Sequence, residues 1–255
     1  MPYCEVDSES IYYERHGSRG AHTLLFVHGA GSTAETWRLC VPDLLQFDCI
    51  LVDLPGHYRS HGTAREGITE YANFLERFIR RLDPQIHNVS LVGHSMGGAI
   101  GLEIACQANT WIQRLIVVTS GSKLKVNENF LSQLSDGKYD LSFVEAGFGS
   151  AAAKELIQQV IAHRALVTVE SSFRDFMACN QFDRRDDISN IQIPVLLVAG
   201  EEDQVTPPFY SVFMHEQIPN SKIEFAKAGH YLPLEQPNLL AAAIHSFLQE
   251  TELVS

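Results

Sequence analysis

The chain lacks the features that mark membrane and secreted proteins. No run in its 255 residues approaches the roughly 18 apolar residues that cross a membrane. Residues 1–10, MPYCEVDSES, have neither the basic nor the apolar part of a secretory signal peptide. We therefore expect a cytoplasmic protein without a membrane span.

Cysteine and basic residues are also scarce. The five cysteines are scattered, and none forms the CxxC pair used in zinc or redox sites. Lysine and arginine number 19 against 31 aspartates and glutamates, which gives a formal net charge of -12. A chain of this charge repels a polyanion, and it has no basic stripe. Nucleic acid is therefore not an expected partner.

The chain does contain a regular alternation of apolar runs and helical patterns. Unbroken apolar runs lie at residues 23–27, 49–52, 89–92, 115–118 and 195–199. Strands of this kind are buried on both faces, as in a parallel sheet covered by helices. Helical periodicities lie at residues 34–45, 68–82, 97–108, 209–217 and 239–249. The alternation predicts a doubly wound α/β sheet whose ligand lies at the carboxyl ends of the strands.

The alternation stops between residues 122 and 191. Four helical patterns follow one another there, at residues 129–135, 141–147, 151–165 and 169–180. We interpret residues 122–191 as a helical lid inserted over the strand ends, with residues 1–121 and 192–255 as the core. The arginines of this stretch are expected to face water, with a carboxylate anchor as the alternative: Arg164, Arg174, Arg184 and Arg185.

The segment VSLVGHSMGG at residues 89–98 places a serine between a strand and a helix of small residues. Gly93 and Gly97 flank Ser95 and remove the side chains that would clash in a sharp strand-to-helix turn. Such a turn exposes the hydroxyl, and the helix N-terminus behind it favours developing negative charge. The pattern therefore predicts that Ser95 is a nucleophile.

These residues, with His28-Gly29 upstream and the segments around Asp203 and His230 downstream, resemble the α/β-hydrolase superfamily over residues 24–248. The sequence GHSMGG is most similar to the small esterases and the monoacylglycerol-lipase-like members. The resemblance implies an α/β-hydrolase fold, with a mostly parallel, doubly wound sheet and an inserted helical lid. Nucleophile, acid and histidine follow one another in the chain order expected for this fold.

The resemblance also implies roles for the site residues. His230, in the loop KAGHYLP, would be the base, and Asp203, in the turn GEEDQVTP, would orient it. The backbone N–H groups of Ala30 and Met96 would form the oxyanion hole. The remaining residues of the two motifs would support the site rather than transfer protons: His28, Gly29, Gly93, His94 and Gly97.

The segment DLPGHYRS at residues 53–60 departs from the family pattern, because Tyr58 stands where a second glycine is common. We expect Tyr58 to disturb the tight turn and to project toward the pocket. His57 and His61 in and after this segment have the HxxxH spacing of a helical metal site, but the surrounding glycines favour a loop. No metal and no cofactor are therefore expected.

The expected activity is that of a serine carboxylic-ester hydrolase, which acts on small to medium, uncharged acyl esters through an acyl-enzyme on Ser95. The resemblance argues against dehalogenases and epoxide hydrolases, which use an Asp nucleophile. Carbon–carbon bond hydrolases usually carry Asn and Trp where this chain has His94 and Tyr231. Other Ser-triad activities of the superfamily, carbon–carbon bond hydrolysis and cofactor-free perhydrolysis, remain alternatives, as does a ligand receptor that keeps the triad but has little turnover. No oligomeric state is predicted.

Overall fold

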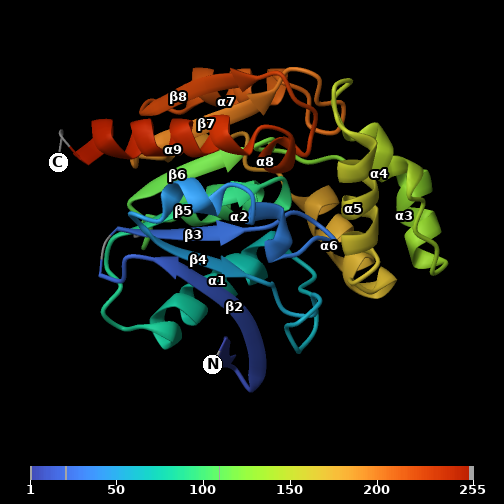
Figure 1. Ribbon diagram of the computed structural model, residues 1–255, viewed down its shortest axis with the longest axis horizontal. Helices are drawn as coiled ribbons and strands as arrows, with labels where there is room; N and C mark the ends of the chain where they lie inside the picture. Colours follow the sequence, from blue (N-terminus) through green and yellow to red (C-terminus); the bar gives the residue numbers. More distant parts are fainter. Residues whose placement is uncertain (1, 21, 109, 253–255) are drawn as a thin grey trace.

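The protein is built around one eight-stranded mixed sheet (Figure 1). The computed structural model describes residues 2–20, 22–108 and 110–252. The spatial order of the strands is β1-β2-β4-β3-β5-β6-β7-β8, and only β1 and β2 run antiparallel to their neighbours. The strands are β1 (Tyr3–Val6), β2 (Glu9–Gly17), β3 (Thr23–Val27), β4 (Asp48–Val52), β5 (Val89–His94), β6 (Arg114–Val118), β7 (Val195–Gly200) and β8 (Ser221–Ala226).

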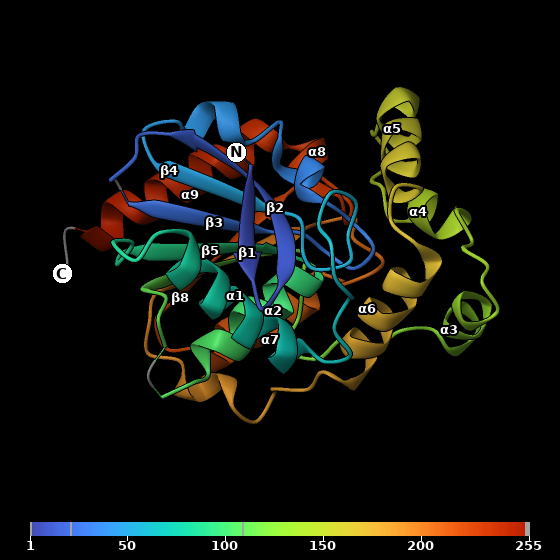
Figure 2. The same ribbon diagram turned by 90° about the horizontal axis from the view of Figure 1, so that it is seen from below.

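Helices cover both faces of the sheet, which is why its central strands are apolar throughout (Figure 2). Alternate residues of β3 point to opposite faces of the sheet and pack in different hydrophobic cores. Leu25 and Val27 pack with α1 (Ile68–Leu82), α2 (Met96–Ala105) and α7 (Phe209–Gln217). Leu24 and Phe26 pack on the other face, with η1 (Ala34–Trp37), η2 (Val41–Leu44) and α9 (Pro237–Glu252). The sheet is therefore a rigid, doubly covered support for the loops at its carboxyl edge.

The predicted helix at residues 34–45 is wrong, because this segment forms the two short 3₁₀ helices η1 and η2. Pro42 lies in the first turn of η2. Proline has no N–H to donate and its ring clashes with the preceding turn of an α-helix, so one continuous helix cannot pass through this position. The short strand β1, the helix α8 (Leu232–Glu235) and the 3₁₀ helix η3 (Ile188–Asn190) were not predicted.

Four α-helices lie between β6 and β7, before η3, and we call them together the helical insertion. They are α3 (Glu128–Ser135), α4 (Ser142–Ala146), α5 (Lys154–Arg164) and α6 (Val169–Gln181). Figures 1 and 2 show them together at the end of the sheet toward which the arrows of β3 and β5 point. Side chains of Asn127 and Thr168 accept hydrogen bonds from the first N–H groups of α3 and α6.

The arginines of the helical insertion do not all face water as expected. Arg164 is only 8% exposed. Its guanidinium donates to the Ala30 carbonyl and to the hydroxyls of Tyr139 and Tyr231, so its charge is stabilised away from water. At the surface, Arg174 pairs with Glu66 and Glu170, and Arg185 pairs with Asp183. Arg184 pairs with Asp187 and with the buried Glu103.

None of the helices described for this chain is long and apolar enough to cross a membrane. All five cysteines lie within the described residues, and each has a free thiol.

Candidate active site

Ser95 lies at the corner between β5 and α2, where the backbone is strained. Its φ of 53° is in the left-handed region, which non-glycine residues seldom adopt. Two hydrogen bonds hold this conformation: the Ser95 N–H donates to the Val118 carbonyl at 3.0 Å, and the Ser120 hydroxyl donates to the Ser95 carbonyl at 2.6 Å. The strained turn directs the Ser95 hydroxyl away from the sheet and toward His230.

The two glycines around Ser95 are required by close backbone packing. A Cβ atom on Gly93 would lie 2.2 Å from the Gly97 carbonyl oxygen, and one on Gly97 would lie 2.2 Å from the Val27 carbonyl oxygen. Both distances are far below van der Waals contact. Any larger residue at either position would therefore displace β3 or the first turn of α2.

His230 bridges Ser95 and Asp203, although the three residues lie on separate segments of the chain. Its Nε2 atom is 3.0 Å from Ser95 Oγ, and its Nδ1 atom is 2.9 Å from Asp203 Oδ2. The carboxylate only accepts, so Nδ1 carries the hydrogen and Nε2 is free to accept the serine proton. This is the arrangement that activates a serine hydroxyl.

Asp203 is kept ionised by the turn in which it lies. Its Oδ1 atom accepts hydrogen bonds from the N–H groups of Val205 and Thr206, at 2.8 and 2.9 Å. Burial raises the pKa of Asp203, but the nearby His230 and these hydrogen bonds outweigh burial and hold that pKa below its ordinary value. Thr206 contributes a further contact, since its hydroxyl donates to Asp203 Oδ2 at 2.8 Å and lies 3.2 Å from His230 Nδ1.

Thr206 was missed in the sequence analysis. The sequence carried a signal for it. In an Asx turn, an aspartate side chain accepts hydrogen bonds from the backbone N–H groups two and three residues later, and Thr206 is the third residue after Asp203.

His94 supports the position of His230 through a contact with its main chain. Its Nε2–H donates to the His230 carbonyl at 2.8 Å, and the Thr119 hydroxyl donates to the same oxygen at 3.0 Å. Burial and the proximity of His230 lower the pKa of His94 to about 3. His94 is therefore neutral near pH 7, and it contacts the backbone of His230 rather than the Ser95 hydroxyl.

His28 supports the loop that carries Ala30. Its Nδ1–H donates to the Gly29 carbonyl at 2.8 Å, and its Nε2 accepts from the Leu54 N–H at 3.0 Å. Burial, followed by the proximity of His57, lowers the pKa of His28 to about 3, so this ring is neutral as well. The Gly29 carbonyl also accepts from the Ser32 N–H at 3.2 Å, which fixes the peptide whose N–H belongs to Ala30.

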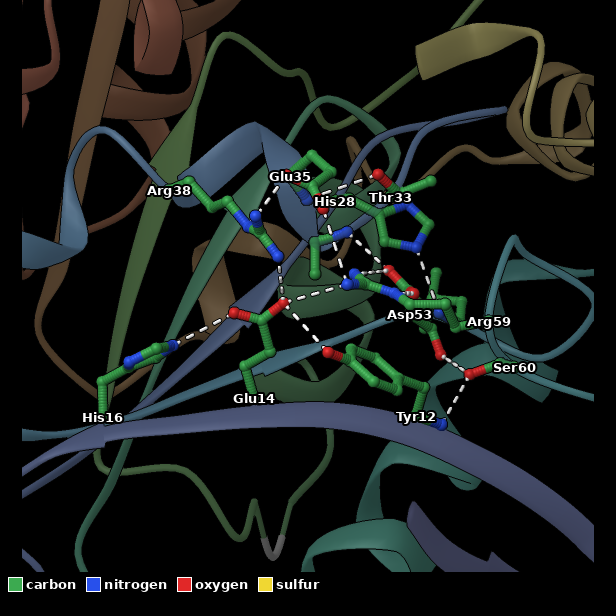
Figure 3. A network of polar contacts seen from close by, with 12 residues as sticks. Tyr12, Glu14, His16, His28, Thr33, Glu35, Arg38, Asp53, Arg59 and Ser60 are labelled. Carbon is green, nitrogen blue, oxygen red and sulfur yellow. Dashed lines mark hydrogen bonds and ion pairs between the residues drawn. The ribbon is translucent and has the colours of Figure 1, made fainter. Parts of the chain in front are cut away.

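A polar network lies next to the loop that carries Ala30 (Figure 3). Buried Asp53 accepts from the Ala34 N–H at 2.7 Å and from Arg59 Nε at 2.8 Å. Figure 3 shows the Arg59 guanidinium between Asp53, which directly follows β4, and Glu14, which lies on β2. The network ties the loop after β4 to the start of η1.

The expectation for Tyr58 is wrong on both points. The turn is retained, because Tyr58 itself adopts a φ of 43°. Its side chain is 45% exposed, and its ring lies 4.8 Å from the Arg59 guanidinium. This contact holds the ring at the surface rather than in the pocket.

His57 forms a buried ion pair with Asp175. Its Nε2 is 2.7 Å from Asp175 Oδ2, and its Nδ1 is 3.0 Å from the Pro55 carbonyl oxygen. Both partners are acceptors, so both ring nitrogens carry hydrogen. Burial lowers the pKa of His57, but the charge and hydrogen bond of Asp175 outweigh it and raise that pKa above its ordinary value. Within the described ranges, no three His, Cys, Asp or Glu side chains are grouped to hold a metal ion.

Comparison with known proteins gives the family. A family model described as "Alpha/beta hydrolase family" matches residues 24–243. The chain belongs to the alpha/beta hydrolase family.

Three relatives illustrate the similarity of this alpha/beta hydrolase. The uncharacterized hydrolase YugF of Bacillus subtilis is 28% identical over 263 residues, which cover 96% of each chain. The pimeloyl-[acyl-carrier protein] methyl ester esterase of Pectobacterium carotovorum is 24% identical, over 94% of this chain and 99% of its own. The crystal structure of a lipase-esterase related protein from Clostridium acetobutylicum is 25% identical, with a TM-score of 0.84 over 93% of this chain and 99% of that one.

A cavity of about 310 Å³ opens beside Ser95 in this alpha/beta hydrolase. Ala30 and Thr206 also line it, so it adjoins both the expected oxyanion hole and the turn of Asp203. Most of the apolar wall comes from the helical insertion and the loop before it, through Leu124, Val126, Phe143, Ala146 and Phe176. Val205 and Tyr210 supply the rest. The cavity is therefore suited to an apolar group bound next to the Ser95 hydroxyl.

The His57–Asp175 pair makes a testable contribution to stability. A histidine whose folded pKa is raised stabilises the fold fully below its unfolded pKa of about 6.5, and this stabilisation is lost as pH rises through the folded pKa. We expect the Tm of the wild type to fall on the alkaline side more steeply than that of His57→Gln, because glutamine does not titrate. A contribution of about 1 kcal/mol corresponds to about 2–4 °C.

Thermal denaturation of both proteins from neutral to alkaline pH measures the difference. Parallel curves would contradict a charged His57.

Proposed function

We propose that the protein is a serine carboxylic-ester hydrolase that acts on small to medium, uncharged acyl esters. The observation that carries this proposal is the contact of 3.0 Å between His230 Nε2 and Ser95 Oγ, beside a largely apolar cavity that Ser95 lines. An adjacent base makes a serine hydroxyl nucleophilic, and Asp203 holds that base in the required tautomer.

The proposed reaction begins when Ser95 Oγ attacks the ester carbonyl carbon and His230 Nε2 takes the hydroxyl proton. The carbonyl oxygen becomes an oxyanion, stabilised by the backbone N–H groups of Ala30 and Met96. Collapse of this intermediate breaks the bond to the alcohol oxygen, which receives the proton from His230. Water then attacks the acyl-enzyme with His230 as base, and the carboxylic acid leaves as Ser95 regains its proton.

The expected oxyanion donors lie where such a charge is stabilised. Met96 is the first residue of α2, so its N–H points out of a helix N-terminus. Ala30 follows Gly29, whose carbonyl is fixed by His28 and Ser32. Donors that are oriented before the reaction need no reorganisation when the charge develops.

The cavity supports a limit on the size of the acyl group. Its volume of about 310 Å³ lies at the small end of ligand pockets, which span roughly 300–1,000 Å³. Phe143 and Phe176 form part of its wall, and both come from the helical insertion. We propose that residues 122–191 act as the lid that sets this limit. Named relatives support the reaction class, since one is a methyl ester esterase and another a lipase-esterase related protein.

A chain-length series tests the proposal. We expect rapid turnover of 4-nitrophenyl acetate, butyrate and octanoate, and at least about tenfold lower kcat/KM for the palmitate, because a long chain exceeds the cavity. Initial rates at matched concentrations, with Ser95→Ala as the background control, give the comparison. A single slow turnover together with a ligand-dependent rise in Tm would instead indicate the receptor alternative.

A further inference from the structure

Two side chains of the helical insertion hold both polar atoms of one peptide in the loop of Ala30. Arg164 Nη1, at the end of α5, donates to the Ala30 carbonyl at 2.5 Å. Asp175 Oδ2, on α6, accepts from the Gly31 N–H at 2.7 Å. This carbonyl and this N–H belong to the same planar peptide unit, so the two contacts fix its orientation.

The loop has few constraints of its own at this point. Gly31 has a φ of 58° and no side chain, so its backbone can turn freely unless it is held. The preceding peptide, between Gly29 and Ala30, is fixed by the core through His28 and Ser32. The direction of the Ala30 N–H therefore depends on two supports, one in the core and one in the helical insertion.

Arg164 and Asp175 are themselves rigidly placed. Asp175 is fully buried and accepts from the Tyr71 hydroxyl at 2.5 Å in addition to its pair with His57. Arg164 donates to the hydroxyls of Tyr139 and Tyr231, at 2.9 and 3.3 Å. Buried charges with several partners keep one geometry, because any displacement leaves a polar group unsatisfied.

We infer that Arg164 and Asp175 are positioning residues for the oxyanion hole, which complete the alignment of the Ala30 N–H while α5 and α6 are seated on the core. The inference rests on the proposed function, in which that N–H stabilises the oxyanion. The same contacts then link the closed state of the helical insertion to the reaction. When α5 and α6 move away, the Ala30–Gly31 peptide loses both partners, and the Ala30 N–H keeps only its support from the core.

Arg164→Met tests the inference, because methionine keeps the apolar stem and removes the guanidinium. Loss of an oxyanion donor costs about 10²- to 10³-fold in rate, and misalignment costs less. We therefore expect kcat for 4-nitrophenyl butyrate to fall about 10- to 100-fold, with KM changed less than about threefold. Arg164→Lys restores a charged donor and should recover part of kcat. Arg174→Met is the matched control, since Arg174 lies on α6 but pairs with Glu66 and Glu170 at the surface.

A second readout does not depend on ester turnover. A fluorophosphonate probe labels the serine when Ser95 Oγ attacks phosphorus, fluoride leaves, and His230 takes the proton. The phosphoryl oxygen then occupies the oxyanion hole, so the labelling rate, followed by intact mass, should fall in Arg164→Met by a factor close to the fall in kcat. Arg174→Met should be labelled at the wild-type rate.

A third readout needs no variant. The Gly31 N–H has Asp175 as its acceptor, so its hydrogen exchange in the wild type should be as slow as that of the amides of α6. Rapid exchange of Gly31 beside a protected α6 would overturn the inference, even if Arg164→Met did not fold.

The remaining outcomes separate the inference from the proposed function. Equal labelling rates in folded wild type and Arg164→Met would overturn the inference even with rapid ester hydrolysis. Labelling that depends on Arg164, in a protein that hydrolyses no ester, would support the inference and overturn the proposed function. No labelling of Ser95 in the folded wild type would overturn both.

Discussion

Ser95→Ala should lower kcat/KM for 4-nitrophenyl butyrate by about 10³-fold or more. The substitution removes Ser95 Oγ, the proposed nucleophile, which lies 3.0 Å from His230 Nε2. The backbone contacts of Ser95 with Val118 and Ser120 remain, so we expect the Tm to change by no more than a few degrees. Steady-state kinetics and thermal denaturation of the same preparation measure both quantities.

The matched control for this prediction is Ser246→Ala, an exposed serine on α9. It should retain the wild-type rate. Rapid mixing followed by acid quench and intact mass measurement adds a direct test, because the wild type should gain the mass of the acyl group and Ser95→Ala should not. A folded Ser95→Ala protein with the wild-type rate would mean that another residue is the nucleophile.

The residues around Ser95 could be placed from the sequence because the constraints on them are local and strong. Gly93 and Gly97 mark a turn that no larger side chain can enter, and the structure gives Cβ clashes of 2.2 Å at both. The segments of Asp203 and His230 follow strands, and the carboxyl ends of parallel strands meet at one edge. Pattern and topology together were sufficient to bring these segments to the same edge of the sheet.

The side chains that support the site could not be placed from the sequence. The partners of Arg164 are 134, 25 and 67 positions away in the chain, at Ala30, Tyr139 and Tyr231. No periodic sequence pattern indicates contacts between residues so far apart in the chain, and an arginine near the end of a helix is ordinarily solvated. Tyr58 illustrates the same limit, since a positive φ at a tyrosine is tolerated only in its tertiary context.

Adjacent histidines in the site need a direct test to separate their roles. The rings of His94 and His230 lie 5.0 Å apart between centroids, and both are buried. Only His230 contacts Ser95 Oγ. His94 has a pKa lowered to about 3 and donates to the His230 carbonyl, so it is both a weak base and directed away from the nucleophile.

His230→Asn should therefore lower kcat/KM by about 10³-fold or more, whereas His94→Asn should lower it by no more than about tenfold, because the Thr119 hydroxyl still donates to the His230 carbonyl. The residual hydrolysis by His230→Asn should increase steadily with hydroxide concentration, because no imidazole remains beside Ser95 Oγ to take its proton. A larger loss in His94→Asn than in His230→Asn, with both proteins folded, would assign the base to His94 and overturn the proposed relay.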